Sequence, residues 1–161
     1  MKMLPVILLL TTALAAGAAA AEADPAEADP AVASQLDALG TSYEIDEDGD
    51  YMMVFEAGEG RSQLVYIRSP IYEYGSHTIR EIWSPAYRAE NGAFPALVAN
   101  HLLEASNDTK LGAWTKQGEY AVFVVKVSGD ASNEEIRDAM TAASEAADEM
   151  EIELTGGGDD F

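Results

Sequence analysis

The strongest constraint on the fold is an amphipathic segment near the end of the chain. From Ile136 to Leu154, apolar residues recur at spacings of four and three, which is the period of one face of an α-helix. Ser132 and Glu135 form the pattern of a capping box before this run, and Gly156 follows it. A long helix with one apolar face must pack against a second layer, which the rest of the chain has to supply.

Short apolar segments separated by turn residues predict that the second layer is a β-sheet. The first three indicate an antiparallel meander, and they are Tyr43–Ile45, Tyr51–Phe55 and Gln63–Ile67. Two more, Lys110–Thr115 and Tyr120–Val127, are joined by a turn at Gln117-Gly118. Within the connection Pro70–Phe94, residues 78–83 are compatible with either a fourth strand or a partly buried connection.

Two further helices complete the expected order of elements. Pro30 stands at the start of a short helix that ends at Gly40, and Pro95 opens a helix that runs to about Ser106. The predicted fold class is α+β, with helices packed on an antiparallel sheet in the order α-β-β-β-α-β-β-α. This predicts one domain over residues 31–155, followed by a Gly/Asp tail at 156–161.

The first residues have the composition of a secretory signal peptide. Lys2 precedes an apolar run that is too short to span a bilayer, and Ala19–Ala21 offers the small residues that signal peptidase recognises. We therefore expect residues 1–21 to be removed by cleavage near Ala21, and the mature protein to be periplasmic or secreted. Residues 22–30 repeat alanine, acid and proline, which predicts an extended acidic linker.

Acidic residues dominate the charge of the chain. Lys+Arg number 9 and Asp+Glu number 29, which gives a formal net charge of -20. Nucleic acid and anionic membrane surfaces are bound through clustered cations, so this balance excludes both classes of partner. Because Cys is 0, disulfides, thiolate catalysis and cysteine-based metal sites are excluded as well.

Two groups of residues suggest chemistry but lack the spacing that it requires. The turn Asp46–Asp50 is rich in carboxylates, yet Gly49 is its fourth residue, whereas a calcium-binding EF-hand loop needs glycine at the sixth. Ser76 and His77 belong to neither a Gly-x-Ser-x-Gly nor an HExxH motif, and His101 falls on the apolar side of its helix. We expect no catalytic, metal or cofactor site. The alternatives are a small exported hydrolase that uses Ser76 and His77, or His101, and an acidic calcium-binding protein.

Aromatic residues offer a stronger candidate for a functional surface. Tyr66, Trp83 and Tyr87 fall in one stretch of the chain, and Trp114 lies in the late hairpin. Tyrosine and tryptophan are frequent at protein interfaces, because they bury a large area and keep a polar group. They are also common in strands, so a role in the core is the alternative. These four residues are the predicted partner-binding surface, on a face or an edge of the sheet.

Several local strings, together with the order of elements, resemble the YbjN family, whose fold is similar to that of type III secretion chaperones. The strings are Gln63-Leu64-Val65-Tyr66-Ile67, Leu102-Leu103-Glu104, Lys110-Leu111-Gly112-Ala113-Trp114 and Ala147-Asp148-Glu149-Met150-Glu151. The resemblance covers most of the chain from Leu36 to Leu154. It implies a chaperone-like fold that binds an extended or helical segment of a partner and tends to dimerise. The signal peptide and the enlarged connection Pro70–Phe94 distinguish this chain from the cytoplasmic members.

These observations predict an exported, non-enzymatic protein-binding module. Members of the YbjN family are described as sensory-transduction regulators, so the resemblance implies a chaperone-like or regulatory role. The expected partner is another protein, and a homodimer is the second form of association that the resemblance implies.

Overall fold

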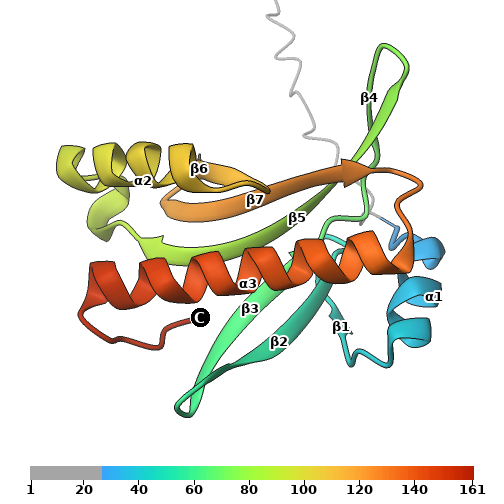
Figure 1. Cartoon of the computed structure of the whole chain (residues 1–161), viewed down its shortest axis with the longest axis horizontal. Coiled ribbons are helices and arrows are strands. Elements are labelled where there is room, and N and C mark those ends of the chain that lie inside the picture. Colours follow the sequence, from blue (N-terminus) through green and yellow to red (C-terminus); the bar gives the residue numbers. More distant parts are fainter. Residues whose placement is uncertain (1–26) are drawn as a thin grey trace, which may run out of the picture.

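The structure is a computed structural model that describes residues 27–161. The predicted signal peptide, 1–21, and most of the predicted linker, 22–30, lie outside the described residues. Within the described range, three α-helices and a seven-stranded sheet form the architecture that Figure 1 shows.

The helices begin and end close to the positions that their local sequences predict. Their bounds are α1 Pro30–Leu39, α2 Ala96–Asp108 and α3 Asn133–Thr155. At the start of α3, the hydroxyl of Ser132 accepts a hydrogen bond from the backbone N–H of Glu135, and the Glu135 carboxylate accepts one from the N–H of Ser132. The predicted capping box is thereby confirmed. No helix in the described part of the chain is both long enough and apolar enough to cross a membrane.

The strands form one antiparallel sheet in the order β1-β2-β3-β5-β7-β6, and β4 pairs with β5 off this path. Their bounds are β1 Glu44–Ile45, β2 Tyr51–Gly58, β3 Arg61–Ile67, β4 Tyr72–Tyr74, β5 His77–Arg88, β6 Ala113–Gln117 and β7 Tyr120–Ser128. β5 has 12 residues and lies between β3 and β7, at the centre of the sheet. A short 3-10 helix, η1 Glu90–Gly92, follows it.

The predicted α+β class and its antiparallel sheet are confirmed, and the helices stand at the expected places in the order. The structure has two more strands, β4 and β5, between the first three strands and α2. The sequence pattern did not decide whether residues 78–83 form a strand, and they belong to β5. Much of the connection Pro70–Phe94 is therefore a hairpin whose second strand is central. β7 is also central, which explains why its residues are apolar on both faces.

The helices cover one face of the sheet. α3 lies across β2, β3, β5 and β7, α1 packs on α3, and α2 packs on β6 (Figure 1). The core lies between the helices and this face, and its largest fully buried side chains include Leu36, Met53, Ile67, Ile82, Phe123, Ile136 and Met140. The opposite face of the sheet carries none of the helices in the described part of the chain, and we call it the open face.

Arg80 is a buried cation that ties the start of α1 to the middle of the sheet. Its side chain is 3% exposed, donates to the carbonyl oxygens of Arg68 at 2.8 Å and Ser69 at 3.1 Å, and pairs with the carboxylate of Asp29. Asp29 also caps α1 by accepting the N–H of Ala31 at 2.9 Å. Burial acts to raise the pKa of Asp29, but the hydrogen bonds from Ala31 and Arg80 hold it below its ordinary value.

We expect Arg80→Met to lower the free energy of unfolding by about 3 kcal/mol, because it leaves the Asp29 carboxylate and two carbonyl oxygens without their buried donor. Urea unfolding followed by circular dichroism measures this change. Arg137→Met is the matched control, since Arg137 is exposed on α3, and its effect should stay within about 0.5 kcal/mol. Equal losses in the two variants would contradict the structural role of Arg80.

Candidate functional site

The central pairing of the sheet is short, and the sheet splits beyond it. β3 and β5 pair only at Tyr66 with Trp83 and at Ile67 with Ile82. Beyond these positions β3 continues with β2 and β5 continues with β7, and Figure 1 shows the two pairs of strands diverging. Pro85 lies just past the last pair, where its missing N–H costs no ladder hydrogen bond to β3.

Side chains satisfy the backbone groups that the split exposes between β3 and β5. The hydroxyl of Ser84 donates to the carbonyl oxygen of Leu64 at 2.6 Å, and the side-chain amide of Gln63 donates to the carbonyl oxygen of Pro85 at 2.7 Å. Both Gln63 and Ser84 are fully buried. A buried backbone carbonyl without a donor is costly, so these contacts stabilise the split as part of the fold.

The tail, Gly156–Phe161, turns back after α3 and lies along the free edge of β3 at this split. The guanidinium of Arg61 donates to the carbonyl oxygen of Gly158, and the Asp159 carboxylate accepts the backbone N–H of Ser62 at 3.1 Å. The N–H of Asp160 donates to a carboxylate oxygen of Glu151, on α3, at 2.6 Å. The tail therefore contacts the free edge of β3 through the side chain of Asp159 and forms no ladder with it.

A buried ion-pair cluster holds this junction together. Arg61 contacts Asp148 at 2.7 Å and Glu151 at 3.2 Å, and the Glu151 side chain is fully buried. Burial raises the pKa of Glu151 above its ordinary value, against the lowering effects of the Asp160 N–H and of Arg61. The hydrogen bond with Asp148 raises the pKa of Arg61, which therefore stays charged.

A depression of about 410 Å³ lies on the open face of the sheet, where the tail ends. It is lined by Leu64, Tyr66, Trp83, Pro85, Gln117, Tyr120, Val122, Asp160 and Phe161. The strand residues of this set alternate in sequence with core residues, which places them on the face away from the helices. The ring of Phe161 meets the ring of Tyr120 edge to face, with centroids 6.2 Å apart.

Two arginines stack on aromatic rings that line this depression. The Arg68 guanidinium lies 4.4 Å from the centroid of the Trp83 ring, and that of Arg88 lies 5.6 Å from the ring of Tyr120. Lys126 reaches Glu81 at 3.2 Å, and Glu81 also accepts the indole N–H of Trp83 at 3.0 Å. Arg68 is also paired with Asp50 at 2.7 Å, and Arg88 with Glu119 at 2.6 Å, so each of the three basic groups already has a carboxylate partner.

The structure brings together two of the four residues of the predicted partner-binding surface. Tyr66 and Trp83 are direct cross-strand partners on the open face. Tyr87 turns to the helix-covered face, because a β-bulge inserts one extra residue between Pro85 and Tyr87 and reverses the alternation. Trp114 is 8% exposed and packs edge to face on a core phenylalanine with ring centroids 5.2 Å apart. The four residues therefore do not form one surface.

Sequence reasoning did not identify several residues that line the depression. Leu64 and Val122 could have been found, since each stands two positions from another open-face residue on its strand. Tyr120 was noted only as an aromatic of the late hairpin. Phe161 carries no local signal of this role, because the tail reaches the depression only through contacts with residues far away in the sequence.

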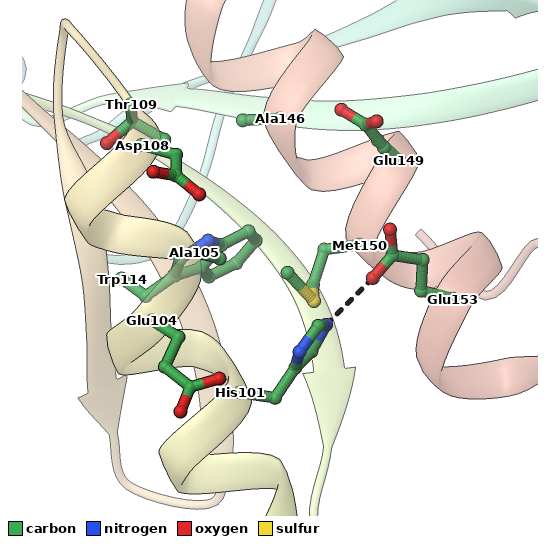
Figure 2. A pocket seen from close by; sticks show the side chains of 10 residues that line it. All are labelled: His101, Glu104, Ala105, Asp108, Thr109, Trp114, Ala146, Glu149, Met150 and Glu153. Carbon is green, nitrogen blue, oxygen red and sulfur yellow. Dashed lines mark hydrogen bonds and ion pairs between the residues drawn. The ribbon is translucent and has the colours of Figure 1, made fainter.

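A second depression, of about 460 Å³, lies between α2 and α3 on the helix side (Figure 2). Figure 2 shows His101 of α2 turned toward Glu153 of α3, and the ring nitrogen Nε2 lies 2.7 Å from the carboxylate. The other carboxylates of its lining are Glu104, Asp108 and Glu149, and its floor includes Trp114 and Met150. The hydrolase alternative at His101 needs a carboxylate, which Glu153 supplies, but no serine is among the residues that line this depression.

Ser76 and His77 lie at the turn between β4 and β5. Both side chains are exposed, and the hairpin that carries them projects away from the rest of the sheet (Figure 1). Neither side chain makes a hydrogen bond with any residue of the described range 27–161. A serine hydrolase orients its histidine with a carboxylate, so this geometry adds no support to a catalytic pair at the turn.

The acidic turn between β1 and β2 uses its carboxylates for the turn itself. One oxygen of Asp46 accepts the N–H groups of Asp48 and Asp50, both at 2.9 Å. Asp50 is fully buried, accepts the N–H of Ser69 at 2.7 Å, and pairs with Arg68 at 2.7 Å. Among the residues that the structure describes, no three or more His, Cys, Asp or Glu side chains are grouped to hold a metal ion.

Comparison with known proteins gives no assignment for this site. No protein-family model matches the sequence, and no curated protein matches it. The resemblance to the YbjN family therefore stays a prediction.

The buried carboxylate of Glu151 predicts a pH-dependent stability. Because its pKa is raised in the folded state, its contribution is fully present below the ordinary value of 4.5 and is lost as the pH rises through the folded-state pKa. We therefore expect the free energy of unfolding to be lower at about pH 8 than at about pH 5. The fall should be smaller in Glu151→Gln.

Urea unfolding at the two pH values measures this difference. Glu149→Gln is the matched control, because Glu149 is an exposed carboxylate on the same helix, and its pH dependence should equal that of the wild type. The assignment to Glu151 fails when Glu151→Gln keeps the full wild-type dependence.

Proposed function

We propose that this protein is an exported, non-enzymatic binding module that holds an extended segment of a partner protein on the open face of its sheet. One observation carries the proposal. The depression at Tyr66 and Trp83 already contacts a segment of chain, which is the protein's own tail, through Asp160 and Phe161. A surface that accepts one peptide segment has the shape and the hydrogen-bonding groups to accept another.

The residues around the depression are those that contribute most to protein interfaces. Tyr66, Trp83 and Tyr120 present aromatic rings, and Arg68 and Arg88 stack on two of them. Tyrosine, tryptophan and arginine are enriched among the few residues that supply most of the binding free energy. When the tail leaves, the N–H of Ser62 at the free edge of β3 can pair with a partner segment, as in β-strand addition.

The resemblance to the YbjN family supports the same function. Its chaperone-like fold implies binding of a partner segment, so we propose a chaperone-like or regulatory role outside the cytoplasm. The net charge of -20 makes nucleic acid and anionic membrane poor partners, which leaves another protein, or a second copy of this chain.

Photo-crosslinking from the open face tests the binding function. With the photoreactive residue p-benzoylphenylalanine at position 66 of the full chain, we expect a defined adduct with a partner protein in the exporting cell. Trp83→Ala should reduce its yield roughly tenfold, because an interface residue of this kind contributes about 1–2 kcal/mol or more. Mass spectrometry of the adduct identifies the partner.

The same photoreactive residue at position 103 is the control, because Leu103 is 67% exposed and lies on α2, on the helix-covered side. Identical adducts from positions 66 and 103, or an adduct at position 66 that is insensitive to Trp83→Ala, would refute the open face as the binding surface.

Export predicts a processed chain. Expressed with its first residues in a bacterial host, the protein should be recovered from the periplasm or medium, with cleavage after Ala20 or Ala21 visible in its intact mass. Leu8→Arg should retain the uncleaved chain in the cell, because it interrupts the apolar run that the export machinery recognises. An uncleaved wild-type chain in the cytoplasm would contradict the proposed localisation.

A further inference from the structure

The tail is held at the depression by a small set of polar contacts and one aromatic ring. Asp159 accepts the N–H of Ser62, Asp160 donates through its backbone to Glu151, and Phe161 packs on Tyr120. Asp159 and Asp160 are exposed, and Phe161 is only half-buried. The recognised pattern is thus an acidic residue at the edge of β3, followed closely by an aromatic ring on the open face.

Two glycines form the hinge between α3 and the tail. Gly156 and Gly157 adopt φ values of 74° and 101°, and no neighbouring atom lies within 4 Å of the side-chain position at either residue. Glycine loses more conformational entropy on ordering than any other residue, so fixing this hinge opposes the binding of the tail. Contacts with Arg61 and Glu151 hold the tail in place, so a partner must offer further contacts to displace it.

Space remains beside the tail when it is bound. Asp160 and Phe161 are part of the wall of the depression, so the volume of about 410 Å³ is unfilled with the tail in place. A longer segment can therefore bury more of Trp83, Leu64 and Val122 than the tail does, and it can displace the tail by making these additional contacts.

The edge of β3 favours an acidic occupant. Arg68, Arg88 and Lys126 are already paired with Asp50, Glu119 and Glu81, but the N–H of Ser62 donates to the carboxylate of Asp159. Hydrogen bonds to a charged group are stronger than neutral ones, which favours Asp or Glu over Asn or Gln at this position.

We propose that the open-face depression recognises an extended segment of a separate protein in which an acidic residue precedes an aromatic one, and that residues 159–161 occupy this place until the partner displaces them. The inference rests on the proposed function and specifies the partner's chemistry. A tethered tail has an effective concentration in the millimolar range, so the identical tail of a second copy does not displace it at ordinary concentrations. A separate partner succeeds through contacts in the space that the tail leaves open.

Binding of a peptide in trans tests this competition. The probe is a fluorescein-labelled peptide with the sequence Thr-Gly-Gly-Gly-Asp-Asp-Phe, which is that of residues 155–161, added to the full-length protein. We expect Phe161→Ala to bind it at least roughly tenfold more tightly than the wild type, because the competing tail is weakened. Fluorescence anisotropy measures the affinity, and circular dichroism shows that each variant is folded.

Two sets of controls define the specificity of the interaction. The peptide with both Asp residues replaced by Asn, and the peptide with Phe replaced by Ala, should each bind Phe161→Ala roughly tenfold more weakly than the parent peptide. Adding Trp83→Ala to Phe161→Ala should abolish binding, whereas adding Leu103→Ala should leave it unchanged, because Leu103 lies on α2. Asp159→Asn is a second variant that weakens the tail, and it should also increase peptide binding.

Equal binding to the wild type and to Phe161→Ala, or no binding to either, overturns the inference. Binding that is insensitive to the Asp and Phe replacements overturns the proposed pattern as well. Dimers of the wild type in sedimentation experiments that Phe161→Ala abolishes would identify a second copy as the occupant and contradict a separate partner. A Trp83-dependent photo-adduct at position 66 without peptide binding would leave the proposed function standing and remove only this inference.

Discussion

The packing of α3 against both halves of a split sheet is the interaction on which the rest of the structure depends. α3 contacts β2 and β3 on one side of the split, and β5 and β7 on the other. One continuous apolar stripe, which includes Ile136, Met140 and Ala147, therefore spans strands whose own pairing stops after two positions. Because hydrophobic burial is not directional, the core can remain continuous where the hydrogen-bonded ladder is interrupted. Packing on α3 therefore holds the two halves of the sheet together where hydrogen bonds between β3 and β5 are missing.

The split in turn creates the candidate site. Pairing of β3 with β5 over their full length would satisfy the backbone edge of β3 and leave no place for a further segment. Pro85 and the bulge beside it stand where that pairing ends, and buried polar side chains of Gln63 and Ser84 satisfy part of the opening. The remaining edge accepts Asp159, so the same interruption that weakens the sheet provides a binding position for an extended chain.

The cations of the open face are used within the molecule. Arg68, Arg88 and Lys126 pair with Asp50, Glu119 and Glu81, and two of them also stack on aromatic rings. The helix side carries the carboxylates around His101. Buried ion pairs at Arg61 and Arg80 use two of the remaining cations to tie the tail and the start of α1 to the sheet, so few basic groups are left to neutralise the outer surface.

Local patterns in the sequence determined the elements whose signals lie within a few residues. The capping box at Ser132, the period of the apolar residues in α3, the turn glycines of the first strands and the start of α2 all depend on short-range geometry, and the structure has each of them. Tyr66 was a candidate on residue type alone, and it lies on the open face. The α+β class followed from these elements, because an amphipathic helix and half-buried strands have few ways to bury their apolar faces together.

Only the tertiary structure decided the features that depend on distant partners. A charged residue such as Arg80 does not indicate a central, buried strand, although it lies in β5. Arg80 can be buried there because it forms an ion pair with Asp29, which is remote in the sequence. Tyr87 does not lie on the predicted surface, because one inserted residue in β5 reverses which side chains face the helices. Residue types alone do not predict this insertion. Phe161 joined the surface because the tail folds back on contacts with Arg61, Ser62 and Glu151. In each case long-range contacts, which local periodicity cannot report, determined which side chains meet.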